Sequence, residues 1–259
     1  MSKELLWIFF HVPRTGGNTI SEALVKIRPK EEILLTSKVR YHPEKIDYSK
    51  LRFIFGHATY YGIHKKIPGK EPRYFTFLRD PAERQTSHYN IKMQYEKEII
   101  PFEIWNKNQV RNEMVHYLDL KFKGSESSSI RGTKILMPII RKLNYRIVYF
   151  LHSIFFKIFK LNKKNDLKKL ENAKKILDLC WFVGVTEKSE EDFNFIINSM
   201  GIKKMSLTRE GKSKKILELS NELRNKIYKE NPLDVELYNY AIALREKKLN
   251  ILKKNKSQK

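Results

Sequence analysis

Short apolar runs that each end in a polar loop recur along this chain, and helical periodicity follows most of them. Residues 5–12 form the first run, which the loop PRTGGNT ends before Ile20, Leu24 and Ile27 repeat at the spacing of a helix. Similar runs occupy residues 52–55, 74–78 and 181–185. Strands that alternate with helices predict an α/β fold with a mostly parallel central sheet, in which ligands bind beyond the carboxyl ends of the strands.

The chain is long enough for one large domain, and it is strongly basic. Its 259 residues include 52 Lys and Arg against 29 Asp and Glu, which gives a net charge of +23. Such an excess indicates an anionic partner, and nucleic acid, anionic lipid, acidic glycan and nucleotide all stay open. A general bias towards Lys, Asn and Ile explains the charge equally well. Charge alone therefore does not decide the function.

Cysteine usage and the N-terminal segment both favour a cytoplasmic protein. Cys180 is the single cysteine, which excludes an intrachain disulfide and a metal site built from cysteines, and we expect it in the core. The first apolar run has no small-residue cleavage site and leads directly into the first loop motif. We therefore expect neither a signal peptide nor a membrane anchor there.

Residues 121–175 differ in composition from the rest of the chain, with 15 basic and 3 acidic residues. Their longest uncharged run, residues 147–156, falls short of the roughly 20 residues that cross a bilayer. Two interpretations stay open: a basic helical insert packed on the domain, which we favour, or an amphipathic helix that rests on anionic lipid or lies over the active site. We expect one domain over residues 1–245, which includes this insert, and a basic C-terminal tail over residues 246–259.

The first loop, residues 13–19, lies between a predicted strand and a predicted helix, where unpaired backbone N–H groups and the helix dipole favour an anion. Two adjacent glycines let the backbone close around a phosphate, Thr15 and Thr19 offer hydroxyls, and Arg14 adds a positive charge. No Lys-Ser/Thr pair follows the last glycine, so the loop lacks the Mg²⁺-binding hydroxyl of a nucleotide hydrolase in its usual place. The sequence predicts a phosphate site here, with a plain turn as the alternative.

The second loop, LRDPAERQTS at residues 78–87, has the same position between a strand and a helix. A proline begins the helix, Asp80 is placed to cap it, and Arg79 and Ser87 can converge on one phosphate. The motif also has an explanation that needs no ligand, in which Asp80 caps the helix and Arg84 forms a local ion pair.

Together, the two loops resemble those of the sulfotransferases that use 3′-phosphoadenosine 5′-phosphosulfate, most closely the glycan branch that includes the heparan sulfate 2-O-sulfotransferases. FFHVPRTGGNTI stands where that family has a strand, a Pro-Lys-Thr-Gly type loop and a helix, and LRDPAERQTS matches Leu-Arg-Asp-Pro-x-x-Arg-x-x-Ser at every fixed position. FVGVTEKSEEDFNFI and NPLDVELYNYA are similar to later parts of the family. The resemblance implies a P-loop-like three-layer fold and sulfuryl transfer from this donor to a hydroxyl group, without a metal.

The resemblance assigns the donor site to both loops and to a third, basic loop, for which a plain surface turn is the alternative. The assigned residues are Arg14, Thr15, Gly16, Gly17, Asn18 and Thr19 for the 5′-phosphosulfate, Arg79 and Ser87 for the 3′-phosphate, Arg84 for shaping the loop or reaching the adenosine phosphate, and Arg209 and Lys212 in the third loop. The family usually has Lys where Arg14 stands. Arg14 can stabilise charge on the departing phosphate, but an arginine, with a pKa above about 12, does not donate a proton to it.

His57 is the expected catalytic base. It follows Gly56 at the end of a predicted strand, and this pair matches the Gly-His of the glycan branch, where the histidine lies at the acceptor and removes the hydroxyl proton. Sulfuryl transfer needs such a base because the acceptor hydroxyl has a very high pKa, and a histidine pKa of about 6.5 suits the task at neutral pH. A structural histidine bonded to a backbone carbonyl is the alternative, and His11 and His64 are weaker candidates for the base.

The acceptor site has a weaker signal in the sequence. Asn108 and Arg111 lie on a predicted helix over residues 102–120 that resembles the acceptor-side segment of the family. Arg111 can pair with a uronic acid carboxylate, and an ordinary surface arginine is the equal alternative.

The leading hypothesis is an enzyme that moves a sulfuryl group from this donor to a hydroxyl-bearing acceptor, a carbohydrate by resemblance, with no specific nucleic-acid partner. A P-loop kinase or nucleotide hydrolase is the alternative, because FTFLRD has the form of an apolar strand that ends in a metal-binding Asp. A nucleic-acid or membrane-surface binding protein built on charge gives no reason for the LRDP motif. Peripheral contact with an anionic membrane stays open beside the leading hypothesis.

Overall fold

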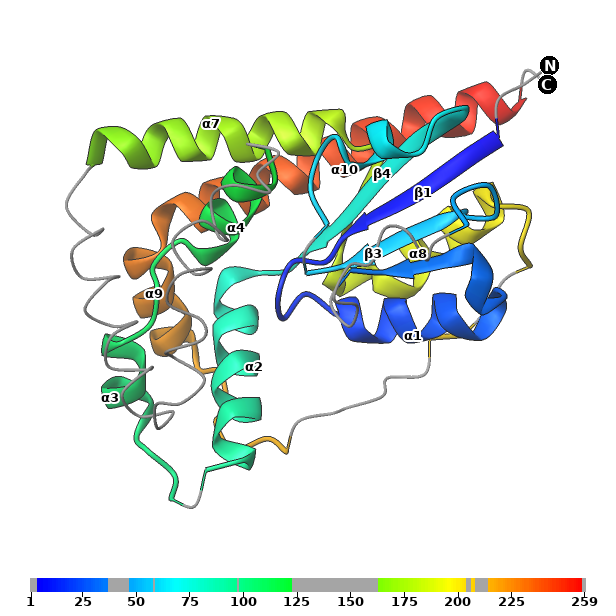
Figure 1. Cartoon of the computed structure of the whole chain (residues 1–259). Coiled ribbons are helices and arrows are strands. Elements are labelled where there is room, and N and C mark those ends of the chain that lie inside the picture. Colours follow the sequence, from blue (N-terminus) through cyan, green and yellow to red (C-terminus); the bar gives the residue numbers. More distant parts are fainter. Residues whose placement is uncertain are drawn as a thin grey trace, which may run out of the picture.

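A five-stranded sheet forms the centre of the molecule (Figure 1). The computed structural model describes residues 4–36, 47–57, 59–96, 98–122, 163–203, 206–207 and 214–257. In chain order, the strands are β1 (Glu4–Phe10), β2 (Ile33–Leu35), β3 (Phe53–Gly56), β4 (Lys70–Leu78) and β5 (Phe182–Val185). They pair in the order β2-β3-β1-β4-β5, and each of these pairs is parallel. The predicted α/β fold with a parallel sheet is confirmed.

Helices cover both faces of the sheet, which gives three layers (Figure 1). The helices are α1 (Gly17–Ile27), α2 (Pro81–Gln94), α3 (Phe102–Lys107), α4 (Glu113–Phe122), α7 (Lys163–Leu179), α8 (Ser189–Ser199), α9 (Asn221–Glu230) and α10 (Pro232–Ser257). Helices α1 and α8 lie on one face, whereas α4 and α7 lie on the other. Helix α10 begins in the cluster of α4 and α7, through Leu237 and Ala241, and its later part joins the cluster of α1 and α8 through Leu249. Within the part of the chain described, no helix combines the length and the apolar composition needed to cross a membrane.

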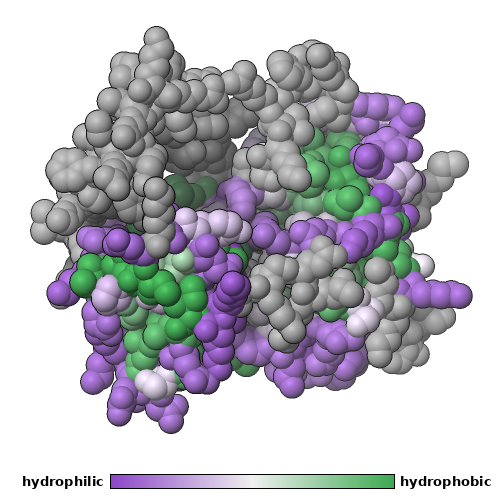
Figure 2. Space-filling view, turned by 90° about the horizontal axis from the view of Figure 1, so that it is seen from below, coloured by the Kyte–Doolittle hydropathy of each residue, from purple (hydrophilic) through white to green (hydrophobic). Residues whose placement is uncertain are grey.

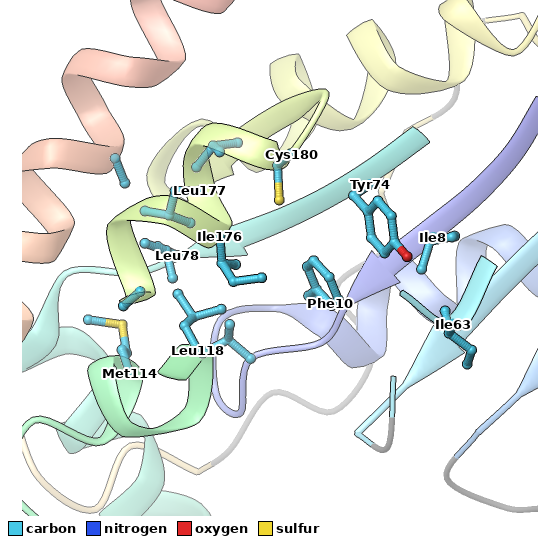
Figure 3. Close-up of a cluster of buried hydrophobic side chains, with 14 of the residues drawn as sticks. Ile8, Phe10, Ile63, Tyr74, Leu78, Met114, Leu118, Ile176, Leu177 and Cys180 are labelled. Atoms are coloured by element: carbon cyan, nitrogen blue, oxygen red, sulfur yellow. The ribbon is translucent and has the colours of Figure 1, made fainter. Parts of the chain in front are cut away.

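Successive residues of β1 contribute to different cores, because side chains alternate between the two faces of a strand. Phe10 belongs to a buried cluster with Leu118 of α4 and Leu177 of α7 (Figure 3). Phe9 belongs to a second cluster on the opposite face, with Ile20 of α1. A parallel strand covered on both faces reads as a continuous apolar run, which is why β1 was recognisable in the sequence. Cys180 is buried in the first cluster, as expected.

The surface carries most of the charge. Figure 2 shows the molecule from below, where hydrophilic residues cover much of the described surface and apolar residues gather in separate patches. Among the exposed large hydrophobic residues, Tyr95 and Ile99 follow α2 and Ile104 lies on α3. The excess of Lys and Arg is therefore compatible with an ordinary apolar core.

The helix predicted over residues 102–120 is instead two helices, α3 and α4, with a break at Asn112. Asn112 has a φ of 53°, and its side-chain oxygen accepts a hydrogen bond from the backbone N–H of Asp234 at 3.2 Å. The Asp234 carboxylate in turn accepts from the backbone N–H groups of Met114 and Val115, at 3.2 and 3.0 Å. Each residue thus caps the helix of the other, and this exchange stabilises the break.

Two predicted segments, the basic insert and the C-terminal tail, overlap the described helices α7 and α10. The basic insert falls mainly on residues 123–162, which lie outside the described residues, while its last part begins α7 and packs on α4 through the buried Leu170. The segment expected to be a tail after residue 245 continues α10 to Ser257, and Leu249 is buried on that helix. The proposed boundary between residues 245 and 246 therefore lies inside a helix.

Candidate active site

A cleft of about 1150 Å³ opens at the carboxyl ends of the strands. The chain runs to one side of β1 for β2 and β3 and to the other side for β4 and β5, so the loops after β1 and β4 are neighbours. Ligands of open α/β sheets bind at this change of direction. The predicted site residues that line the cleft are Arg14, Gly16, Gly17, Asn18, Thr19, His57, Arg79 and Ser87.

Arg14 places a largely uncompensated positive charge in this cleft. Its Nη2 donates a hydrogen bond to Ser87 Oγ at 3.1 Å, whereas its Nε is buried without a partner. No carboxylate pairs with Arg14 among the described residues. Burial, together with the positive charges of Arg79 and Arg84, lowers the pKa of Arg14. An arginine in these surroundings is stabilised by a bound anion.

The N-terminus of α1 contributes to the same site. Gly16 precedes the helix with a φ of 81°, a conformation that favours glycine. Neither a capping side chain nor an acidic residue compensates the first turn of α1. The backbone N–H groups of the first turn have no partner within the helix, and they add to the positive potential from Arg14.

Gly17 is required by the packing of His11. A Cβ atom at position 17 would lie 1.9 Å from Cδ2 and 2.1 Å from Nε2 of His11, far inside van der Waals contact. Glycine is therefore favoured at the two positions for different reasons. Gly16 has a backbone conformation that favours glycine, and Gly17 leaves room for the imidazole ring of His11.

Gly17→Ala should therefore lower the free energy of unfolding by about 1–3 kcal/mol, as overpacking does in other cores. Urea denaturation measures this loss. Asn18→Ala is the matched control, because Asn18 is the next residue of α1 and is exposed. In the His11→Ala variant, where the imidazole is absent, adding Gly17→Ala should change the free energy of unfolding very little. Two strictly additive losses would contradict the contact.

The second loop has the predicted position, and the carboxylate of its Asp80 is fully engaged in hydrogen bonds and an ion pair. Asp80 caps α2 by accepting from the backbone N–H groups of Ala82 and Glu83, at 3.0 and 2.9 Å. It also accepts from the Tyr228 hydroxyl and pairs with Arg224 Nη1 at 2.9 Å. The N-cap role predicted for Asp80 is confirmed, and its oxygens have little capacity left for a metal ion.

Arg79 and Ser87 both line the cleft, Arg79 from the position just after β4 and Ser87 from α2. Arg79 Nη2 lies 3.4 Å from Glu83 Oε2, and the other oxygen of Glu83 accepts from Arg224 at 3.0 Å. The side chain of Arg79 is one quarter exposed. Its long contact with Glu83 leaves it free to meet a phosphate from the cleft.

His57 lies just after β3 and Arg79 lies just after β4, so the two residues are on opposite sides of the loop that follows β1. The His57 ring is stacked on His11 with 4.2 Å between centroids and 27° between planes. His57 is exposed over much of its surface, and partial desolvation lowers its pKa below the usual 6.5. Lys121 also lowers this pKa, whereas a hydrogen bond to the His11 backbone raises it. His57 is therefore mainly neutral at neutral pH and can accept a proton. His64 instead shares a hydrogen bond of 2.7 Å with the Tyr74 hydroxyl and does not line the cleft.

Thr15 does not offer its hydroxyl to the cleft, contrary to the prediction. The residue has no exposed surface, and its hydroxyl donates to the Val12 carbonyl at 2.9 Å. Its side chain therefore closes the loop from inside, because the unpaired backbone carbonyl needs a donor there.

Arg84, Arg111 and Asn108 also lie away from the cleft lining. Arg84 is buried and donates to Glu113 Oε2 at 2.8 Å, which favours the loop-shaping role over contact with a phosphate. Arg111 pairs with Glu230 at 3.1 Å, and its contact with an acceptor carboxylate stays a prediction. Asn108 is exposed beside α3, and its side chain contacts the Ile104 carbonyl. Arg209 and Lys212 lie outside the described residues.

The end of β5 holds the two loops together, a role that no single motif indicated. The Thr186 hydroxyl lies 2.9 Å from the carbonyl of Thr15, in the loop after β1, and 3.1 Å from the carbonyl of Leu78, at the end of β4. Glu187 accepts from the backbone N–H of Asp80 at 3.0 Å. Both residues line the cleft, and their position just beyond a parallel strand was the available signal.

Comparisons with known proteins add little to this geometry. No family model and no curated protein matches the chain. Among solved structures, the crystal structure of mouse sulfotransferase SULT7A1 complexed with PAP is similar, with 13% sequence identity and a TM-score of 0.32. That comparison covers 93% of this chain and 90% of the other.

Proposed function

We propose that this protein is a sulfotransferase that moves a sulfuryl group from 3′-phosphoadenosine 5′-phosphosulfate to a hydroxyl group, with a carbohydrate as acceptor. The observation that carries the proposal is the pair of cationic loops at one cleft: Arg14 without a carboxylate partner beside the uncapped α1, and Arg79 beside Ser87. Two anion sites on adjacent strand ends suit a nucleotide with phosphates on both sides of its ribose.

The rest of the cleft suits a nucleoside. From the strand ends it continues along α2, where Ile91 and Tyr95 line it, and it is completed by Leu217. Aromatic and aliphatic side chains provide surfaces for a flat base, while the arginines bind its phosphates. This combination favours a nucleotide over a free inorganic anion.

The chain's own residues account for each charge in the reaction. The donor supplies a sulfuryl group whose S–O bond to the nucleotide phosphate breaks as the bond to the acceptor oxygen forms. Neutral His57 takes the proton of the attacking hydroxyl. Arg14 and the first turn of α1 stabilise the negative charge that gathers on the departing phosphate. Charge is thus neutralised at both ends of the transfer.

The position of Asp80 favours transfer over metal-dependent hydrolysis. A nucleotide hydrolase or P-loop kinase uses the acidic residue at this strand end to hold Mg²⁺. Asp80 is committed to the α2 cap, to Tyr228 and to Arg224. Binding of ATP that strictly requires Mg²⁺ would nevertheless favour the hydrolase.

Binding should favour adenosine 3′,5′-bisphosphate over 5′-AMP by more than about tenfold, because each charge-assisted hydrogen bond to the extra phosphate contributes about 1.5–3 kcal/mol. Arg79→Ala should remove most of this preference in calorimetric titrations. Arg73→Ala is the matched control, since Arg73 lies on β4, the strand that Arg79 directly follows, and pairs with Glu71 away from the cleft. Equal affinity of the wild-type protein for both nucleotides would refute the donor assignment.

Transfer itself is tested with labelled donor and a panel of glycans and small alcohols. The carbohydrate acceptor rests on the Gly-His that His57 shares with the glycan branch. Label on a glycan alone would support it, and label on simple alcohols alone would contradict it. Preference for the bisphosphate without transfer to any acceptor would retain the nucleotide site and reject the transferase.

A further inference from the structure

His11 occupies a closed position between the core and the cleft. It follows β1, is 6% exposed and lines the cleft. Its ring packs against two others: it is nearly parallel to Phe9, at 5.7 Å and 9°, and stacked on His57 at 4.2 Å. A third contact comes from Gly17 at the start of α1, which is where a side chain would collide with the ring.

The surroundings keep this imidazole neutral. Burial lowers the pKa of His11 to about 3, and the charge of His57 in its protonated form and the charge of Arg14 act in the same direction. On the other side of the stack, α4 faces His57 with Lys121 and Tyr117, both of which donate to the His57 carbonyl. A histidine that stays neutral across the physiological range neither takes up the acceptor proton nor repels a protonated neighbour.

We propose that His11 is a positioning residue, whose ring fixes the plane of the His57 imidazole and keeps water from one of its faces. The inference rests on the proposed function, in which His57 is the base. Three rigid contacts hold His11: Phe9 from the sheet, Gly17 from α1 and His57 itself. Helix α4 holds His57 only through its backbone carbonyl. The His57 ring meets His11 in two ways, in the stack and in a hydrogen bond to the His11 backbone, so the stack is the contact that a substitution of the His11 side chain removes. A base that is misoriented by a small distance loses much of its effect.

The test compares His11→Ala with His11→Phe in the full chain. The alanine variant removes the stack and admits water, so the pKa of His57, followed by NMR titration of the imidazole, should rise towards the usual 6.5. Its kcat should fall roughly tenfold to a hundredfold with nucleotide affinity unchanged. The phenylalanine variant keeps an aromatic face, so it should retain the low His57 pKa and most of kcat.

Two outcomes would overturn the proposal. One is an unchanged His57 pKa and kcat in the alanine variant. The other is equal loss of kcat in both variants with the His57 pKa unchanged, which would place His11 at the reacting group itself. The NMR titration needs no acceptor, so it also separates this proposal from the proposed function. A wild-type protein without transferase activity would reject the function, while a pKa that rises in His11→Ala and not in His11→Phe would still establish the stack.

Discussion

Replacing His57 with alanine should slow sulfuryl transfer by roughly 10² to 10⁴, which corresponds to about 3–5 kcal/mol of activation free energy. Nucleotide affinity should stay nearly unchanged, because His57 faces the proposed acceptor side and the arginines hold the donor. His64→Ala is the control, since that histidine is bonded to Tyr74 away from the cleft. A His57→Ala variant with near-normal turnover would contradict the assignment.

The pH dependence gives a second measure of the same residue. The pKa of His57 is lowered from the usual 6.5, so the neutral, proton-accepting form predominates above that value. Turnover should therefore be constant at neutral pH and decrease as pH falls through the lowered pKa. In the His57→Ala variant this acid limb should be absent from the residual rate.

Replacing Arg245 with methionine should lower the free energy of unfolding by about 3–5 kcal/mol, because it leaves a buried carboxylate without its partner. That carboxylate belongs to Asp192 of α8, which has no exposed surface. Arg245 Nε donates to both of its oxygens, at 2.8 and 2.9 Å. Asp192 also accepts from the backbone N–H of Val185 on β5, so the pair ties α10 to the sheet.

Urea denaturation measures the effect, with Lys247→Met as the control for an exposed cation on the same helix. Burial raises the pKa of Asp192 while Arg245 opposes that rise. The pKa of Asp192 is raised even with Arg245 in place, and the loss of Arg245 raises it further, so the carboxylate becomes still easier to protonate in the folded state than in the unfolded one. The variant should therefore recover stability as pH falls from neutral towards weakly acidic values. A loss of less than about 1 kcal/mol at neutral pH would contradict a buried ion pair.

The fold was predictable where the signal was local. Strands covered on both faces appear as apolar runs, and the loops between strands and helices stand out by their Gly, Pro and Asp residues. Strand β2 has only three residues, too few for such a run. The break at Asn112 depends on Asp234, which is far away in the sequence. Leu249 of α10 lies among lysines, so the end of that helix resembled a tail.

The candidate site was predictable only in part for a similar reason. Parallel topology brings Arg14, His57 and Arg79 to one edge of the sheet, whatever their distance in sequence. The direction of a side chain depends on what packs beside it. Arg84 and Arg111 meet carboxylates from other helices, and these partners were not visible in the sequence around either arginine.

The contacts of Thr186 and Glu187 determine how the cleft responds to the length of a ligand. Their hydrogen bonds hold the β1 and β4 loops at a fixed separation. A molecule whose two anions match that separation binds the second one at a high effective concentration once the first is bound. A molecule with one anion, or with two that are closer together, gains nothing from the second loop. In the proposed function, selectivity among nucleotides then follows from the distance between two charges, and the contacts at the end of β5 set that distance.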